Sequence, residues 1–143
     1  MEAGISGRKD EGAFSVVLSK GGYEDKDNGE TISYCGTRGV EGKITHNTKL
    51  MRTSYRLQTP IRVIRSSKSL NKVYAPTEGF RYDGLYIIKG EQVLDQETAH
   101  FRFDLERLPN QDEIRCRGTV GERPTRKERE VLKIDRERRG LSN

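Results

Sequence analysis

Short apolar runs separated by glycine-rich and polar turns dominate the pattern of this chain. Residues 14–19 (FSVVLS) form an apolar, β-branched run between glycines, which predicts a buried strand. The runs at residues 31–35, 61–64 and 84–89 predict three further strands. Residues 100–108 alternate apolar and charged side chains with the period of two that is typical of a strand. We expect strand 31–35 to lie beside strand 14–19, with an acidic loop between them.

A different period appears across residues 45–57, where apolar side chains recur at helical spacing. Thr45 or Asn47 can cap the start of this helix, and Pro60 closes the segment. Five strands and one helix predict an α+β domain.

The 143 residues are enough for one domain, but only 31% are hydrophobic and 34% are charged. Residues 113–143 hold ten Lys and Arg, six Asp and Glu, and few apolar side chains. We therefore expect a folded domain at residues 1–112 and a basic tail at residues 113–143. Within the tail, residues 124–140 read as a charged helix that begins at a proline and stops at a glycine.

Two cysteines, Cys35 and Cys116, are too few for a disulfide framework and lack the spacing of a zinc site. No apolar run approaches the length of a membrane helix, and no signal-like segment follows Met1. These features predict an intracellular protein in a reducing compartment, with no membrane and no metal.

Charge is unevenly spread along the predicted domain. Residues 38–72 hold nine basic side chains and one acid, whereas residues 21–30 hold four acids and one base. A polyanion could dock on the basic stretch through its phosphates while the carboxylates read another feature. Ordinary solvated surface explains the same composition. By charge and position, the candidate phosphate contacts are Arg62, Arg65, Lys68 and Lys72.

Residues 21–39 combine tyrosines, carboxylates and glycines, a set that suits a pocket better than a core. Aromatic faces can stack on a flat ring such as a nucleobase, and carboxylates can accept hydrogen bonds from its amine. A hairpin with an acidic, solvated turn is the alternative interpretation of this segment.

Three ordered segments resemble one known family. They are GISGRKDEGAFSVVLSKGGYEDKDNG at residues 4–29, TPIRVIRS at 59–66 and YAPTEGFRYDGLYIIK at 74–89. They are similar to the SRA domain, also called YDG after the tripeptide that here is Tyr82, Asp83 and Gly84. The resemblance covers about residues 4–108.

The resemblance implies a strongly twisted, barrel-like β-sheet of the SRA/PUA type, flanked by helices. It also implies a nuclear reader of double-stranded methylated DNA that flips 5-methylcytosine into a pocket and uses no cofactor or catalytic residue. Histone or chromatin proteins are further candidate partners.

The resemblance also assigns roles to residues. Tyr23 and Tyr34 would sandwich the flipped ring, and either Asp25 or Asp27 would accept its amine. We prefer Asp25, because it follows the GGYE sequence most directly. The candidates for the recess that holds the methyl group are Cys35, Gly36 and Thr37.

The chain departs from the family pattern around the DNA. Gly4 lies where the family approaches DNA with a thumb residue, and it is a candidate contact. The long basic finger of the family is reduced here to residues 38–43, in which Arg38 or Lys43 could partly fill the hole left by the base. The YDG motif suggests no chemistry of its own, so we expect Asp83 to cap a turn and Tyr82 to pack on the sheet.

Two other functions compete with that of a methyl reader. Asp104, Asp112 and Glu113 are too loosely placed for a nuclease metal site, so we expect no enzyme. An SRA-like scaffold with a degenerate pocket is the alternative, and it would bind nucleic acid or chromatin proteins without methyl selectivity.

Overall fold

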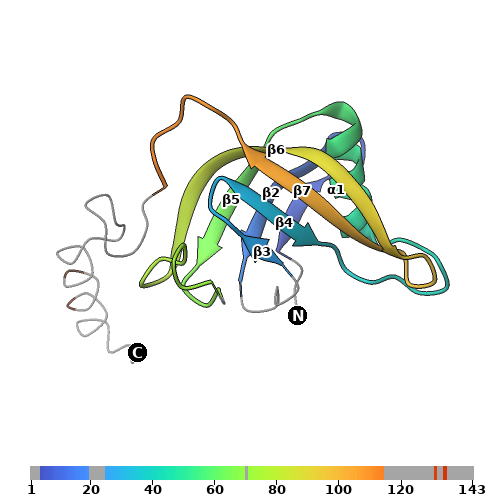
Figure 1. The fold of residues 1–143 in the computed structure, drawn as a ribbon, viewed down its shortest axis with the longest axis horizontal. Coiled ribbons are helices and arrows are strands. Elements are labelled where there is room, and N and C mark those ends of the chain that lie inside the picture. Colours follow the sequence, from blue (N-terminus) through green and yellow to red (C-terminus); the bar gives the residue numbers. More distant parts are fainter. Residues whose placement is uncertain (1–3, 20–24, 70, 115–130, 132–133, 135–143) are drawn as a thin grey trace.

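Within the part of the chain that the structure describes, seven strands form one twisted, open sheet. This computed structural model describes residues 4–19, 25–69, 71–114, 131 and 134. In chain order, the elements are β1 (Ile5–Arg8), β2 (Gly12–Leu18), β3 (Lys26–Asp27), β4 (Thr31–Cys35), α1 (His46–Leu57), β5 (Ile61–Ser66), β6 (Phe80–Asp95) and β7 (His100–Arg107). The sheet order is β1-β2-β5-β6-β7-β4-β3, and the long strands β6 and β7 arch across it (Figure 1).

Most strand predictions are confirmed, but the expected neighbour of β4 is wrong. Strand β4 pairs with β3 and β7, whereas β2 pairs with β1 and runs parallel to β5. A parallel pair needs a long crossover, and the chain from β3 through α1 supplies it. The short strands β1 and β3 were not predicted, and β6 is much longer than the expected run at residues 84–89.

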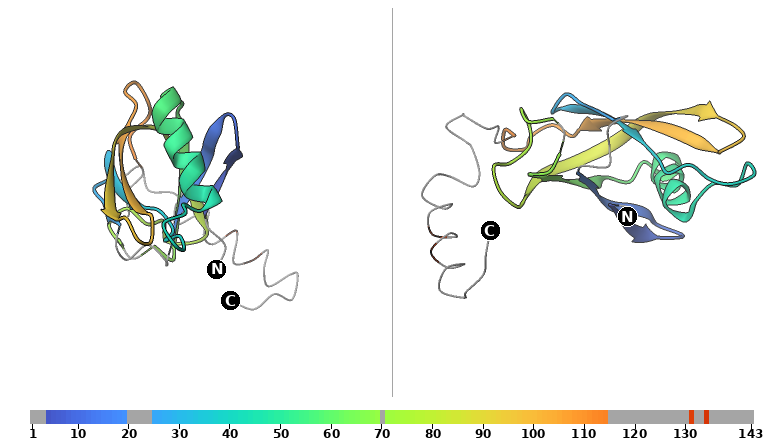
Figure 2. Two further views of the ribbon diagram at one scale, coloured as in Figure 1. Left: turned by 90° about the vertical axis from the view of Figure 1, so that its right-hand side faces the viewer. Right: turned by 90° about the horizontal axis from the view of Figure 1, so that it is seen from below.

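Helix α1 begins where the sequence indicates. Thr45 is its N-cap, and its side chain accepts a hydrogen bond of 3.2 Å from the backbone N–H of Thr48. The helix ends at Leu57, and its C-cap Gln58 adopts the left-handed conformation common at helix C-termini. It lies between the β1–β2 hairpin and β6, as the left view of Figure 2 shows.

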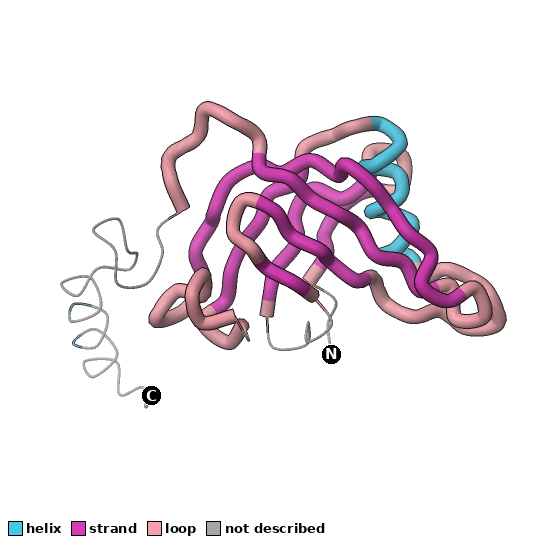
Figure 3. Tube along the Cα trace, viewed as in Figure 1, coloured by secondary structure: helices cyan, strands magenta, loops and turns pink. Residues whose placement is uncertain are grey.

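The core lies between α1 and the sheet. Its most buried side chains, all at most 2% exposed, include Val16, Met51, Val63, Ile88 and Phe103. Strands supply most of this core. Figure 3 shows that strands make up much more of the fold than the helix does. The predicted α+β class with a strongly twisted sheet is confirmed, although the described residues form one flanking helix rather than several and the sheet does not close.

The expected charged helix at residues 124–140 lies almost entirely outside the described residues. Of that segment the structure describes only Val131 and Ile134, whose side chains are exposed. None of the helices in the described part of the chain has the length and apolar character needed to cross a membrane.

Candidate functional site

A hydrogen bond brings the acidic segment onto β4 at the predicted pocket. Asp25 stands just before β3, and its Oδ1 accepts a 2.7 Å hydrogen bond from the backbone N–H of Cys35, the last residue of β4. Cys35 directly follows Tyr34 in the chain, so this hydrogen bond holds the Asp25 carboxylate close to Tyr34. Two residues that the resemblance assigned to one pocket therefore do lie together.

The phenol of Tyr34 keeps its proton. Its ring is partly buried and packs against the hydrophobic core. Burial is the main cause that raises the pKa of Tyr34 above its usual value, and the nearby negative charge of Asp25 raises it further. The ring is thus a neutral aromatic surface whose hydroxyl can donate a hydrogen bond. Tyr23, the other half of the predicted sandwich, lies outside the described residues.

The three candidates for the methyl recess lie where β4 leaves the sheet. The backbone N–H of Gly36 donates to the carbonyl of Phe101 at 2.9 Å, and the carbonyl of Thr37 accepts from the Thr48 hydroxyl at 3.4 Å. A Cβ atom at Gly36 would stand 2.8 Å from that hydroxyl oxygen, so the helix approaches closely only because this residue is glycine.

Cys35 differs from the other two candidates for the recess, Gly36 and Thr37, in where its side chain lies. Successive side chains of a strand point to opposite faces, so the thiol faces away from the Tyr34 ring. It lines a separate cleft of about 380 Å³ together with Arg38, Asp95, His100 and Arg102. On the Tyr34 side, Cys35 contributes its backbone, including the N–H that holds Asp25.

Asp27, the second candidate for the base-binding carboxylate, is already engaged by another group. The Arg65 guanidinium donates to both of its carboxylate oxygens, at 2.7 and 2.8 Å. The Asp27 side chain is only 7% exposed. The geometry therefore favours Asp25 over Asp27 for contact with a ligand.

The expectation that Arg65 contacts a DNA phosphate is wrong for this structure. Its side chain is fully buried, with 0% exposed, and it also binds Asp83 at 2.8 Å. Burial acts to lower the pKa of Arg65, but the hydrogen bonds and charge of Asp27 outweigh it and raise the pKa, so the guanidinium stays charged. The physical reason is strand periodicity, since Ile61, Val63 and Arg65 share the buried face of β5.

The structure also contradicts the expectation that Asp83 caps a turn and that Tyr82 packs on the sheet. Asp83 caps no turn; it lies within β6, where it is 3% exposed and binds both Arg65 and Arg81. Tyr82 does not pack into the sheet, because its side chain is 56% exposed. Gly84 has a positive φ of 106°, which favours glycine there.

The other candidate DNA contacts lie on the surface. The side chains of Arg62 and Lys68 are exposed, and the exposed Lys72 donates to the carbonyl of Ser67 at 3.0 Å. Gly4 packs closely on β2, where its carbonyl accepts a 2.7 Å hydrogen bond from the N–H of Val17. These positions are compatible with DNA contact.

The loop that carries Arg38 and Lys43 extends away from the pocket segment. Its backbone is bonded to the β6–β7 turn, where the N–H of Gly42 donates to the carbonyl of Glu97 at 2.7 Å. Figures 1 and 2 show this loop at the tip of the β6–β7 hairpin, away from β3. This placement does not favour the idea that Arg38 or Lys43 fills the hole left by a flipped base.

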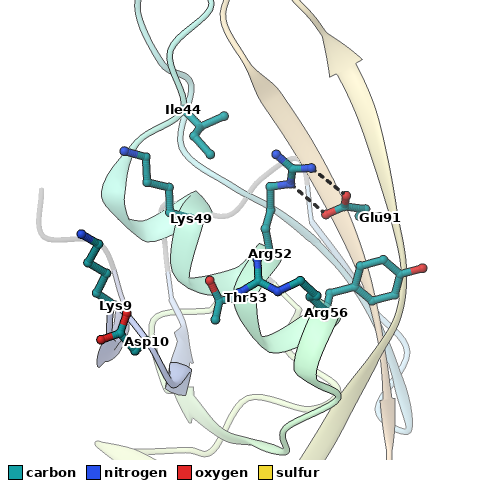
Figure 4. Close-up of a pocket in the computed structure, with 9 residues that line it drawn as sticks. Lys9, Asp10, Ile44, Lys49, Arg52, Thr53, Arg56 and Glu91 are labelled. Carbon is teal, nitrogen blue, oxygen red and sulfur yellow. Dashed lines mark hydrogen bonds and ion pairs between the residues drawn. The ribbon is translucent and has the colours of Figure 1, made fainter.

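Sequence reasoning missed a basic cleft of about 610 Å³ on the outer face of α1 (Figure 4). Lys49, Arg52 and Arg56 line it from the helix, Lys9 lines it from the β1–β2 turn, and Arg52 is paired with Glu91 at 3.3 Å. The spacing of the three helical cations was a signal that could have placed them on one face.

Comparisons with known proteins bear on the family and the fold of this chain. The family model described as the SAD/SRA domain matches residues 1–111. The E3 ubiquitin-protein ligase ORTHRUS 2 of Arabidopsis thaliana is 38% identical over 101 residues, which cover 61% of this chain and 16% of that protein. The chain thus spans about a sixth of the length of this curated relative.

Solved structures show the same fold. A modification dependent TagI restriction endonuclease is 31% identical with a TM-score of 0.63, and the match covers 76% of this chain and 43% of that chain. The SRA domain of SUVH5, crystallised with fully methylated CG DNA, is 29% identical with a TM-score of 0.58, and the match covers 78% of each chain.

Proposed function

Because the chain belongs to the SAD/SRA domain family, we propose that it is a binding module for duplex DNA that carries 5-methylcytosine. The modified base leaves the double helix and enters a pocket formed by Tyr23, Asp25 and Tyr34. The observation that carries this proposal is the Asp25 carboxylate held against the N–H of Cys35 beside a neutral Tyr34 ring. The SUVH5 SRA domain, similar in fold, was crystallised with fully methylated CG DNA.

Base flipping fits the energies that these side chains can supply. Extrusion of a base from duplex DNA costs a few kcal/mol. Stacking on an aromatic ring returns about 1 to 3 kcal/mol. Two tyrosine faces would therefore offset much of the cost, and one ring alone would leave most of it to hydrogen bonds.

Asp25 provides selection for cytosine. A carboxylate offers about four acceptor sites, so the bond from Cys35 is compatible with a further bond from the exocyclic amine of cytosine. Thymine carries an oxygen in place of that amine and would be repelled by the carboxylate. The methyl group contributes only about 0.8 kcal/mol on burial, so strong methyl selectivity requires a closely fitting recess. We propose that the backbone of Cys35 and residues Gly36 and Thr37 form it.

The DNA backbone is held by the exposed cations. We propose that Arg62, Lys68 and Lys72 contact phosphates, together with the backbone at Gly4. Arg38 and Lys43, at the tip of the β6–β7 hairpin, would reach a more distant part of the duplex.

The module works by binding and performs no catalysis of its own. We propose that residues 1–112 form the reader and that the basic residues 113–143 add nonspecific attraction to DNA or to chromatin proteins in the nucleus.

A titration with matched duplexes tests the proposal. Fluorescence anisotropy at fixed salt should show tighter binding to a duplex with 5-methylcytosine than to the same sequence unmodified. A charge-assisted hydrogen bond contributes about 1.5 to 3 kcal/mol, so Asp25→Ala should weaken methylated binding by about tenfold or more. Asp10→Ala removes an exposed carboxylate from the β1–β2 turn and is the matched control.

A second signal reports base flipping directly. A 2-aminopurine placed next to the methylated cytosine should brighten when the base leaves the stack. Equal affinity for both duplexes, with no brightening and no effect of Asp25→Ala, would instead support a scaffold with a degenerate pocket.

A further inference from the structure

A buried network of ion pairs connects the YDG motif to the pocket segment. The Arg65 guanidinium stands at its centre, between Asp27 on β3 and Asp83 on β6. Arg81 donates to both carboxylate oxygens of Asp83, to Oδ1 at 2.5 Å and at 2.8 Å to the Oδ2 that Arg65 also binds. All four side chains are at most 7% exposed, so the network is screened from water.

The network holds the turn after β3 at several points. One nitrogen of Arg65 also donates to the carbonyl of Gly29 at 3.0 Å, and the Tyr86 hydroxyl donates to the same carbonyl at 2.5 Å. The Asn71 side chain donates to the backbone carbonyl of Asp27 at 2.5 Å. The turn is thus fastened to β5, to β6 and to the loop between them.

We propose that Arg65 and Asp83 are positioning residues, which set the place of Asp25 in the base pocket without touching the base. Asp25 precedes Asp27 by two residues, so the clamp on Asp27 limits how far the Asp25 carboxylate can move from the N–H of Cys35. This gives the YDG aspartate a role in recognition through Arg65. The inference rests on the proposed function for its consequence in DNA binding, but the positioning itself can be measured in the free protein.

Arginine is required for this role because of its shape. Its planar guanidinium presents several N–H groups in a fixed fork, so it can bind Asp27 with two nitrogens and Asp83 with the third. A lysine at this position keeps the positive charge but offers a single ammonium group, which cannot hold both carboxylates and the carbonyl of Gly29 in the same geometry.

The test uses Arg65→Lys and Asp83→Asn, with Met51→Ala as the control. Met51 lies on α1 with its side chain fully buried in the core, and it takes no part in the network, so its truncation lowers stability without loosening the clamp. All variants are studied at a temperature at which circular dichroism shows them folded.

The first readout is hydrogen exchange at the Cys35 amide by NMR. Exchange of this amide should speed up by about tenfold or more in Arg65→Lys and Asp83→Asn, relative to Met51→Ala at matched stability. This measurement needs no DNA, so it tests the positioning even if the protein proves to have no methyl preference.

The second readout is the dissociation constant for the methylated duplex at fixed salt. Arg65→Lys should raise this constant by about tenfold, which corresponds to about one charge-assisted hydrogen bond from the base to Asp25, and Met51→Ala should leave it unchanged. Equal affinity of the wild-type protein for methylated and unmodified duplexes would refute the proposed function alone. Unchanged Cys35 exchange, or unchanged affinity for the methylated duplex in both network variants, would overturn the positioning role.

Discussion

Removing the central cation of the buried network should destabilise the protein severely. Arg65→Met keeps most of the volume of the side chain but leaves the Asp27 and Asp83 carboxylates buried, 7% and 1% exposed, without their shared cation. Loss of one partner from a buried ion pair costs about 3 to 5 kcal/mol, because the remaining charge is uncompensated. Domains of this size are stable by only about 5 to 15 kcal/mol, so the variant should be marginal.

Urea unfolding followed by far-ultraviolet circular dichroism measures this loss, since the chain has no tryptophan to report by fluorescence. Arg62→Met is the matched control, because Arg62 lies on the same strand with its side chain exposed. Its effect should stay within about 0.5 kcal/mol.

In Arg65→Met, Asp27 loses both of its bonds to a guanidinium, whereas Asp83 keeps its two bonds to Arg81. Asp27 is therefore the main source of the cost, because its buried carboxylate loses its cation. Equal losses for Arg62→Met and Arg65→Met would contradict this explanation.

Three further predictions concern single contacts. The pKa of Tyr34 is raised in the folded state, so the unfolded phenol ionises first and the contribution of Tyr34 to stability should be lost as the pH rises above about 10. Tyr34→Phe should flatten this alkaline decline in the free energy of unfolding, measured by urea titrations. An equally steep decline in the variant would contradict the prediction. The double variant Arg62→Gln, Lys68→Gln should lower the slope of log binding constant against log salt concentration by about 0.9 for each phosphate that the protein no longer neutralises. Lys49→Gln on α1 should leave this slope unchanged. Equal slopes for the two variants would argue against a role of Arg62 and Lys68 at the phosphates. Ser54→Ala removes a buried hydroxyl that accepts a 2.8 Å hydrogen bond from the backbone of β2, so the free energy of unfolding should fall by about 1 to 3 kcal/mol. A loss below about 0.5 kcal/mol would show that β2 needs no such partner.

The parts of the fold that depend on local pattern were predictable from the sequence. The bounds of β4 follow from its run at residues 31–35, and the start of α1 follows from the N-cap Thr45. The two-residue strand β3 is too short to leave a periodic signal. The partner of β4 could not be predicted either, because its pairing with β7 brings together residues that lie far apart along the chain, such as Tyr34 and Phe103.

The same division applies to the site. Asp25 and Tyr34 could be nominated from the resemblance, since both lie in one short segment. Arg65 was predicted as a phosphate contact because it is a cation in a basic stretch, but the period of two along β5 places it with Ile61 and Val63 on the buried face. Its partners Asp27 and Asp83 are 38 and 18 residues away along the chain, so local pattern alone could not reveal the network.

A crystal structure of this protein with a duplex that contains 5-methylcytosine tests the central proposal most directly. We expect the modified base outside the double helix, with its exocyclic nitrogen about 3 Å from the Asp25 carboxylate and its ring against Tyr34. A methylated base that remains stacked in the duplex, or one that enters the protein at a site away from Asp25, would contradict it.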